Sequence, residues 1–329
     1  MILVTGATGT VGLGIVEKLA AGSEPVRALV RDPVRAQTLL PPNVELARGD
    51  VTETATLDAA CRGVRLVFHA AGMPEQWQQD DGIFDRVNRQ GTANVLGAAR
   101  RAGVQRVVYT STMDVFTAER GGTLVEEHVD TRDKPTAYER SKQAAEREAD
   151  AIAKQGLDVV FVNPAAVYGP SPIRTALNLF FTKLLAGQVP LIPPGGLPLA
   201  YLDGVVAVHL AAAERGQRGE RYLVADQHVS MVELATLILE AEGKGRLPPP
   251  RSPVWLVRLL AAASAPLARR FGFQPLVAPG ELSFLLWDVR VDAAKAQRDL
   301  GFIPTPAAVG VRRTVAAFSR TSSGSDSAR

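Results

Sequence analysis

The chain of 329 residues has one cysteine, four histidines, few aromatic residues and no long apolar run. Because Cys61 is alone, no internal disulfide can form, and a reducing, cytoplasmic location is expected. The histidines, at positions 69, 128, 209 and 228, lack metal-ligand spacing, so no metal site is expected. No apolar stretch reaches the roughly 18 residues that a transmembrane helix requires, and the first residues lack the pattern of a signal peptide.

Charge of one sign is not concentrated in any run of the sequence. The net charge is +3 although the pI is about 9.1, and the basic residues are mostly scattered arginines. A nucleic-acid partner is therefore not expected. A hydrophobic content of 46% with 22% charged residues is typical of a globular protein, and the length allows one large domain or two.

Apolar runs alternate with helical patterns through the first half of the chain. The runs are rich in Val and Leu with little polar alternation, which indicates strands buried on both faces of a parallel sheet. This alternation predicts an α/β fold of the Rossmann type, with a doubly wound parallel sheet. The expected strands are Ile2–Thr5, Val26–Val30, Val44–Ala47, Leu66–His69, Val107–Thr110 and Val159–Val162, and the expected helices are Val11–Ala21, Val87–Ala102 and Tyr138–Gln155.

Gly6, Gly9 and Gly12 follow the first expected strand at intervals of three and open the first expected helix. The first glycine allows a tight turn, the second lets backbone N–H groups approach a pyrophosphate, and the third lets the helix pack closely on the sheet. The helix N-terminus then offers unpaired N–H groups and a partial positive charge to phosphates. This context predicts a dinucleotide site, and a packing turn without a ligand is the alternative.

The end of the second expected strand distinguishes NAD from NADP. An NAD site usually has Asp or Glu there, which binds the ribose 2′-hydroxyl. Here Arg31 ends the strand and Arg35 follows one helical turn later, so the two arginines predict a 2′-phosphate and hence NADP. Asp32 keeps NAD as the alternative. Asp50 is placed either to accept a hydrogen bond from the adenine amino group or to cap the next helix.

Tyr138 and Lys142 are four residues apart and share one face of their expected helix. The lysine ammonium lowers the pKa of the phenol, ordinarily about 10. Tyr138 can then donate a proton to a carbonyl oxygen during reduction, and Thr112 is expected to hydrogen-bond the same oxygen. Behind a dinucleotide turn, these groups predict hydride transfer between a nicotinamide and a carbon bearing oxygen. An exposed tyrosine and a solvated lysine on an ordinary helix are the alternative.

After Pro164 the sequence changes to segments rich in Pro and Gly. We expect residues 1–170 to form a dinucleotide-binding domain with the catalytic residues. Residues 171–318 are expected to form mainly a smaller substrate-binding lobe that partly returns to the main sheet, and the Ser-rich residues 319–329 a disordered tail. The helical candidates of this half are Ala176–Ala186, Met231–Glu242 and Trp255–Ala268.

Seven motifs in the first 170 residues resemble those of the extended short-chain dehydrogenases/reductases and occur in that family's order. The stretch 295–304 resembles the family's C-terminal ending. Within the family, Arg27–Pro33 and Val162–Pro164 resemble the dihydroflavonol-reductase-like and 3β-hydroxysteroid-dehydrogenase-like branch. The seven motifs are Thr5–Gly12, Gly49–Val51, Phe68–Gly72, Val87–Thr92, Tyr109–Thr112, Tyr138–Lys142 and Asn163–Pro170.

The resemblance implies a role for each matching residue. Thr112, Tyr138 and Lys142 take the positions of the catalytic triad, and Lys142 also holds the nicotinamide ribose. Ser111 is a substitute for Thr112, and Asn88 supports the active site and cofactor. The residues expected to bind the cofactor are Gly6, Thr8, Gly9, Thr10, Val11, Gly12, Arg31, Arg35, Asp50, Val51, Ala70, Ala71, Gly72, Lys142, Asn163 and Pro164.

Aromatic residues outside these motifs predict an apolar substrate, with Trp77, Phe180 and Phe181 expected beside Thr112 and Tyr138. We therefore expect an NADP(H)-dependent oxidoreductase that interconverts a ketone and a secondary alcohol on a hydrophobic small molecule. A steroid, a β-keto acid or a dihydroflavonol is the kind of substrate implied, and a homodimer is the expected assembly. A sugar-nucleotide epimerase or dehydratase with tightly bound NAD, and a non-catalytic dinucleotide sensor, are the alternatives.

The segment Trp255–Phe273 is apolar with interspersed arginines. Three structures fit such a pattern: a lid over an apolar substrate, a helix on a membrane surface, and a core helix with arginines that extend to solvent. The sequence leaves all three open.

Overall fold

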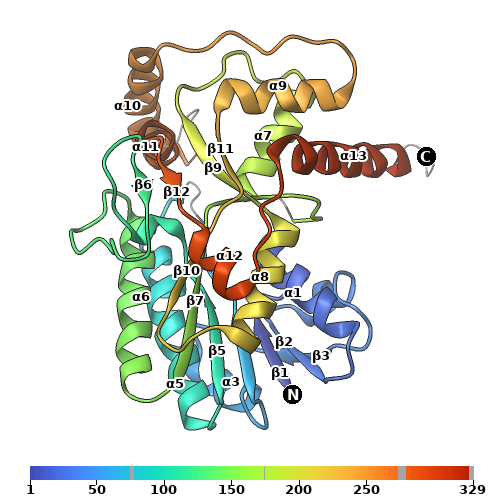
Figure 1. Cartoon of the computed structure of the whole chain (residues 1–329), viewed down its shortest axis with the longest axis vertical. Helices are drawn as coiled ribbons and strands as arrows, with labels where there is room; N and C mark the ends of the chain where they lie inside the picture. Colours follow the sequence, from blue (N-terminus) through green and yellow to red (C-terminus); the bar gives the residue numbers. More distant parts are fainter. Residues whose placement is uncertain (75–77, 174, 273–278, 326–329) are drawn as a thin grey trace.

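Seven parallel strands form the central sheet of the structure, a computed structural model that describes residues 1–74, 78–173, 175–272 and 279–325 (Figure 1). The strand order is β10-β7-β5-β4-β1-β2-β3, and each neighbouring pair is parallel. This confirms the predicted doubly wound sheet of the Rossmann type. The strands are β1 (Ile2–Thr5), β2 (Val26–Val30), β3 (Glu45–Arg48), β4 (Leu66–His69), β5 (Arg106–Thr110), β7 (Asp158–Pro164) and β10 (Arg221–Val224).

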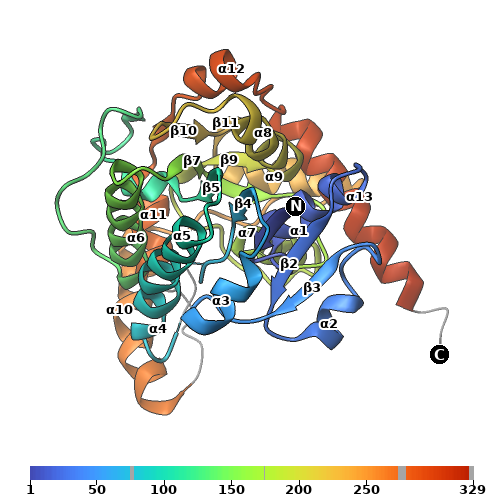
Figure 2. The ribbon, with the colours of Figure 1, turned by 90° about the horizontal axis from the view of Figure 1, so that it is seen from below.

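Consecutive strand residues are buried on opposite faces of this sheet. Val4 and Phe68 belong to a core with helices α1, α8 and α12, whereas Leu3 and Val67 belong to a core with α3, α5 and α6. Figure 2 shows these two helical layers on either side of the strands. The helices are α1 (Thr10–Ala20), α2 (Pro33–Gln37), α3 (Thr54–Ala60), α5 (Gly91–Arg101), α6 (Ala137–Lys154), α8 (Leu202–Arg215) and α12 (Ala294–Leu300).

One helix predicted as a single α-helix begins with a π-helical turn in the structure. The expected helix Val87–Ala102 consists of a π-helical segment, η1 (Asp85–Gln90), that continues into α5. A short α4 (Gly82–Phe84) precedes it, and a 3₁₀ turn, η2 (Met113–Val115), follows β5. The π-helical turn is wider than an α-helical one and often marks a functional site. η1 contains Asn88, and Thr112 caps η2; both residues are expected in the active site.

A second group of elements has its own hydrophobic core. Phe181, Leu199, Ile238 and Val311 are among its buried members. This core joins a three-stranded sheet to helices α7, α9 and α13, while α10 and α11 lie beside it at the upper left of Figure 1. The elements are β8 (Ala166–Tyr168), β9 (Gly196–Tyr201), β11 (Gln227–Ser230), α7 (Ala176–Leu185), α9 (Met231–Glu242), α10 (Val254–Phe271), α11 (Pro279–Trp287), α13 (Ala307–Ser325), and the strand pair β6 (Thr123–Leu124) and β12 (Arg290–Val291).

After β8, α7 and β9 of this second group, the chain returns to the main sheet, where α8 packs on α1 and β10 pairs with β7. The division at residue 170 stays a prediction. The disordered tail expected over 319–329 also stays a prediction; α13 extends to Ser325. Val311 and Val315 of this helix are buried in the second core, which anchors the helical turns that follow them. Residues 326–329 lie outside the described residues.

Candidate active site

The glycine turn after β1 has no room for side chains. Gly6 has φ +69°, and a Cβ there would lie 2.6 Å from the carbonyl carbon of Ala70. A Cβ on Gly12 would lie 2.1 Å from the carbonyl oxygen of Gly6. Gly9 caps α1 without a side-chain hydrogen bond, so the first N–H groups of α1 remain available to an anion. The turn therefore fits a pyrophosphate.

A cavity of about 290 Å³ opens beside this turn, at the carboxyl ends of β1, β2 and β4. Ligands of doubly wound sheets bind at this edge, where the strand order reverses. Thr10, Val11 and Gly12, which the sequence also predicts at the cofactor, are not part of its described lining, and the Thr10 hydroxyl instead donates to the Ile173 carbonyl at 3.4 Å. The lining residues expected from the sequence are Gly6, Thr8, Gly9, Arg31, Arg35, Asp50, Val51, Ala70, Ala71 and Gly72.

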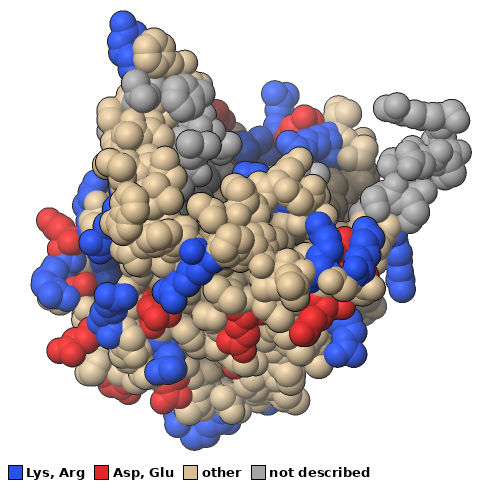
Figure 3. Space-filling view, turned by 90° about the horizontal axis from the view of Figure 1, so that it is seen from above, with Lys and Arg blue, Asp and Glu red and all other residues tan. Residues whose placement is uncertain are grey.

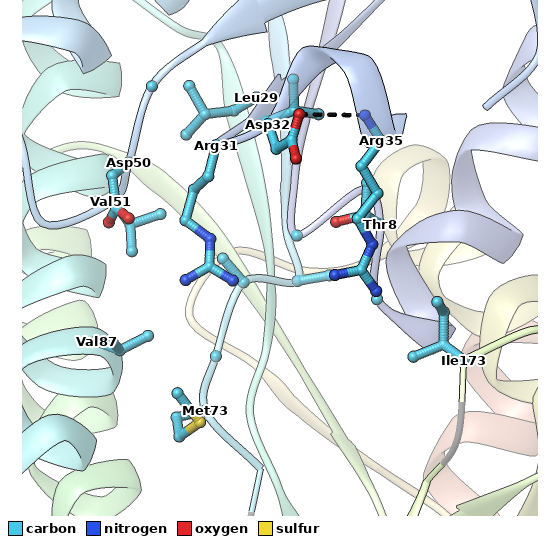
Figure 4. A pocket seen from close by; sticks show the side chains of 17 residues that line it. Thr8, Leu29, Arg31, Asp32, Arg35, Asp50, Val51, Met73, Val87 and Ile173 are labelled. Carbon is cyan, nitrogen blue, oxygen red and sulfur yellow. Dashed lines mark hydrogen bonds between the residues drawn. The ribbon is translucent and has the colours of Figure 1, made fainter. Parts of the chain in front are cut away.

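Arg31 and Arg35 extend into this cavity from one side, as Figure 4 shows. The Asp32 carboxylate turns towards its own helix, where it accepts a hydrogen bond from the Arg35 backbone N–H at 3.1 Å. Asp50 also lines the cavity, and one of its oxygens accepts from the backbone and hydroxyl of Thr52, each at 2.8 Å. Two guanidinium groups thus face the cavity, while Asp32 serves as a helix cap.

A second cavity, of about 400 Å³, adjoins the first. Met73 lines the first and Pro74 the second, so one loop borders both. Thr112 and Tyr138 contribute hydroxyl groups to its wall, and Asp114 and Thr175 are its other polar members. The apolar lining residues are Pro74, Met113, Ala165, Ala166, Val167, Ala176, Leu177, Phe180, Pro193, Leu197, Met231, Phe284 and Leu285.

Helix α6 positions Tyr138 and Lys142 one turn apart. A capping box between Thr136 and Glu139 fixes the start of the helix, with both hydrogen bonds at 3.0 Å. The Tyr138 ring lies edge-on to Phe84, with the ring centroids 6.0 Å apart. Its neighbour Lys142 is buried against the end of β5.

The Lys142 ammonium donates to the Thr110 carbonyl at 3.0 Å and lies 5.1 Å from the centroid of the Tyr109 ring. Burial lowers the pKa of Lys142 to about 8, while the charges of Glu146 and Asp114 act in the opposite direction. With a pKa of about 8, Lys142 is mostly protonated at neutral pH but loses its proton at a much lower pH than an exposed lysine does.

Thr112 and Ser111 lie on opposite sides of this region. The Thr112 hydroxyl lines the apolar cavity and donates to Asp114 Oδ2 at 2.7 Å. The Ser111 hydroxyl donates to the Glu146 carboxylate and is not part of the cavity lining. The sequence offers both hydroxyls for the same place in the catalytic triad. Of the two residues, Thr112 is the one that lines the same cavity as Tyr138.

Sequence reasoning missed two buried carboxyl groups. Burial raises the pKa of Asp114 to about 6, and its Oδ1 has no hydrogen-bond partner within the described part of the chain. Glu146 is 2% exposed and pairs with Arg221, with Nε and Oε1 2.6 Å apart. Both left a signal in the sequence, because Asp114 comes two residues after Thr112 and Glu146 one turn after Lys142.

Asn88 lines neither cavity but fixes the loop between them. Its side-chain oxygen accepts from the Met73 N–H at 2.7 Å. Its nitrogen donates to the Met73 carbonyl at 3.1 Å and to the Ser141 hydroxyl at 2.9 Å. Asn88 therefore ties this loop to α6, where Tyr138 lies.

Three residues predicted to contact the cofactor or the substrate lie outside the described lining of both cavities. Asn163 is fully buried behind the site, where its nitrogen donates to the Thr112 carbonyl at 3.1 Å and to Glu146 at 3.0 Å. Neither it nor Pro164 is part of the described lining of either cavity. Phe181 is also fully buried, with its ring centroid 5.9 Å from that of Tyr168 and the two rings tilted by 31°, so it belongs to the core rather than to the lining of the second cavity. Trp77 lies outside the described residues.

A dinucleotide turn beside a cavity that Tyr138 lines, with Lys142 one turn further along α6, defines the class of protein. Lys142 itself is not among the described lining residues of either cavity. The protein is an NAD(P)-dependent oxidoreductase of the extended short-chain dehydrogenase/reductase type. The chain belongs to the NAD dependent epimerase/dehydratase family, whose model matches residues 2–225. This confirms the family that the sequence motifs resemble.

Relatives of known name match almost the whole chain. Sterol demethylase protein B of Methylococcus capsulatus is 34% identical over 321 residues, which cover 96% of this chain and 97% of that protein. A 3 beta-hydroxysteroid dehydrogenase/Delta 5-->4-isomerase of Mycobacterium tuberculosis is 31% identical over 325 residues, which cover 92% of this chain and 86% of that protein. The crystal structure of gox2253 superposes with a TM-score of 0.82 at 29% identity, and 98% of each chain is covered.

Proposed function

We propose that the protein interconverts a ketone and a secondary alcohol on an apolar small molecule, with NADP(H) as the hydride carrier. The observation that carries the proposal is the second cavity, next to the dinucleotide cavity, where Thr112, Asp114, Tyr138 and Thr175 are the only polar residues among the described residues of a mainly apolar wall. A pocket of this kind binds apolar ligands and orients them with a few polar groups.

A sugar diphosphate suits this cavity poorly. Binding its phosphates would call for converging basic side chains, yet none of the described residues that line the cavity is Lys or Arg. The nearest candidates in the sequence do not supply them, because Lys183 is exposed on α7 and outside the lining, and Arg174 lies outside the described residues. The relatives named as sterol and hydroxysteroid enzymes support an apolar substrate as well.

The preference for NADP rests on the arginines at the end of β2. Arg31 and Arg35 bring two positive charges to the cavity, which favours a 2′-phosphate. The Asp32 carboxylate is occupied by the N–H of Arg35. With this hydrogen bond in place, the Asp32 carboxylate is less suited to accept one from a ribose 2′-hydroxyl.

The chain's own groups supply the proton transfer. When bound, the nicotinamide donates or accepts the hydride. Tyr138 gives its phenolic proton to the ketone oxygen during reduction and takes it back during oxidation. Lys142 stabilises the phenolate by its charge. The Thr112 hydroxyl donates its single proton to Asp114 Oδ2 at 2.7 Å in this structure; to hold the ketone oxygen beside Tyr138 it must rotate and donate that proton to the substrate instead.

The function can be tested with purified protein and a panel of substrates. We expect NADPH to be consumed stoichiometrically with a hydrophobic ketone such as a ketosteroid, measured by loss of reduced-cofactor absorbance. A UDP-sugar should leave the cofactor signal unchanged and should not be converted. Interconversion of a UDP-sugar without net cofactor change would instead establish an epimerase and overturn the proposal.

Arg31→Ala should separate the two cofactors. Losing a charge-assisted hydrogen bond to the 2′-phosphate costs roughly 1.5–3 kcal/mol, so NADPH affinity should fall by about ten- to a hundredfold. NADH affinity should hardly change, because NADH lacks that phosphate. Fluorescence titration with each cofactor measures both constants. Arg120→Ala, which removes an exposed arginine outside the cavity, serves as the control. If the wild type binds NADH more tightly than NADPH, the NADP preference is wrong, and Asp32 is the residue that binds the ribose 2′-hydroxyl of NAD.

A further inference from the structure

Helix α10 exposes large apolar side chains to solvent. Its inner face packs on α11, where Val257 and Ala261 form a small core with Leu282. On its outer face, Trp255 is 67% and Leu259 58% exposed. The core-helix alternative for this segment is therefore wrong over the described residues. Of the eight exposed large hydrophobic side chains identified in the described chain, five lie between residues 247 and 271, namely Leu247, Trp255, Leu259, Leu260 and Phe271.

The lid alternative does not account for this outer face either. α11, rather than α10, lines the substrate cavity, through Phe284 and Leu285. None of the described residues that line this cavity comes from α10. α10 packs on α11, and Trp255 and Leu259 on its opposite face are largely exposed within the part of the chain that the structure describes.

The charge around this helix has one sign. Between residues 243 and 280 the sequence contains six Lys and Arg residues and no Asp or Glu. Arg258 and Arg270 are exposed on α10 itself. Figure 3 shows the projecting ridge at the upper left as mostly uncharged, with basic atoms at its end. Over the rest of the visible face, acidic and basic residues are mixed.

We propose that the outer face of α10, with its flanking cations, binds an anionic lipid surface. An apolar stripe with Trp and Leu, bordered by Arg, is the pattern of helices that lie in the membrane interface. Anionic headgroups attract such cations, and each one near the surface adds to binding. A second copy of this chain would bring the same positive charge to the same face, which opposes self-association there.

The helix lies on the lipid rather than crossing it. Within the described ranges of the chain, no helix combines the length and apolar character needed to span a membrane. The proposal is independent of the proposed function, because lipid binding can be measured without substrate or cofactor.

Vesicle flotation tests the proposal with the full chain and no ligand. We expect the wild type to float with vesicles of equal parts phosphatidylglycerol and phosphatidylcholine, and far less with phosphatidylcholine alone or in high salt. Leu259→Glu should weaken binding at least about tenfold, because it places a negative charge in the apolar stripe. Ile303→Glu is the matched control, since Ile303 is 82% exposed outside α10, and it should bind like the wild type.

A second measurement does not depend on a destabilising change. The fluorescence of Trp255 should shift to shorter wavelength on anionic vesicles, and Trp255→Phe should remove that shift while binding persists. No flotation of the wild type, or equal loss in Leu259→Glu and Ile303→Glu, would overturn the proposal. So would a concentration-dependent dimer that Leu259→Glu dissociates, since a second copy would then be the occupant.

Discussion

Replacing Tyr138 by Phe should reduce turnover at least about 10²-fold and leave cofactor affinity nearly unchanged. The change removes the proposed proton donor and keeps the ring, so the edge-on contact with Phe84 at 6.0 Å can persist. Lys142, the residue proposed to hold the nicotinamide ribose, is unchanged in this variant, which is why NADPH binding should survive. Steady-state rates of ketone reduction and a cofactor titration measure the two effects separately.

Tyr109→Phe is a matched control for this experiment. The Tyr109 hydroxyl lies 3.5 Å from the Lys142 ammonium, yet the residue is fully buried and lines neither cavity. Its loss should cost roughly 1–3 kcal/mol of stability but less than about tenfold in turnover. Near-normal turnover in Tyr138→Phe, or a larger loss in Tyr109→Phe, would assign the proton transfer to another group.

The parts of the fold that sequence predicts well are those that local pattern determines. β1, β2 and β4 begin and end at the expected residues, because strands buried on both faces give short apolar runs with clear ends. The tight turn at Gly6 and Gly12 follows equally well from the sequence. Both positions require glycine, because a Cβ there would collide with the backbone. α9 also has its expected bounds, because Ser230 caps it and Gly243 ends it in the left-handed region.

The side chains of α7 show where such reasoning stops. Phe180 and Phe181 are neighbours in sequence, and both were expected at the substrate. Consecutive residues of a helix point in directions roughly 100° apart, so only one of the two faces the cavity. The structure places Phe180 there and Phe181 in the core. Which residue faces which side depends on how α7 packs against the second sheet, and that information is absent from the local sequence.

The buried polar network behind Lys142 was beyond prediction for a related reason. Glu146 accepts from Ser111 and Asn163 and pairs with Arg221, partners that come from β7, β10 and the end of β5. Only the assembled sheet brings these segments together. The family resemblance implies a cofactor contact for Asn163, whereas its side chain donates to Glu146 behind the site.

Lys142→Met should damage both turnover and cofactor binding, since the proposed role of Lys142 is double. Methionine keeps much of the side-chain length but has no charge. We expect turnover to fall at least about 10²-fold and NADPH affinity by about tenfold, the loss of one charge-assisted hydrogen bond. Lys142→Arg, which keeps the charge, should recover part of the cofactor affinity. A variant with normal turnover would remove Lys142 from the mechanism.

The same substitution has a signature in stability that does not depend on activity. Because burial lowers the pKa of Lys142 from 10.5 to about 8, the unfolded chain holds this proton more tightly than the folded chain. The free energy of unfolding should therefore rise with pH between those two values, by up to about 3 kcal/mol. Lys142→Met should lack this rise, and denaturant unfolding of both proteins across that range measures the difference. Parallel curves for the wild type and Lys142→Met would show that the lysine keeps its ordinary pKa, and with it its charge, in the folded protein.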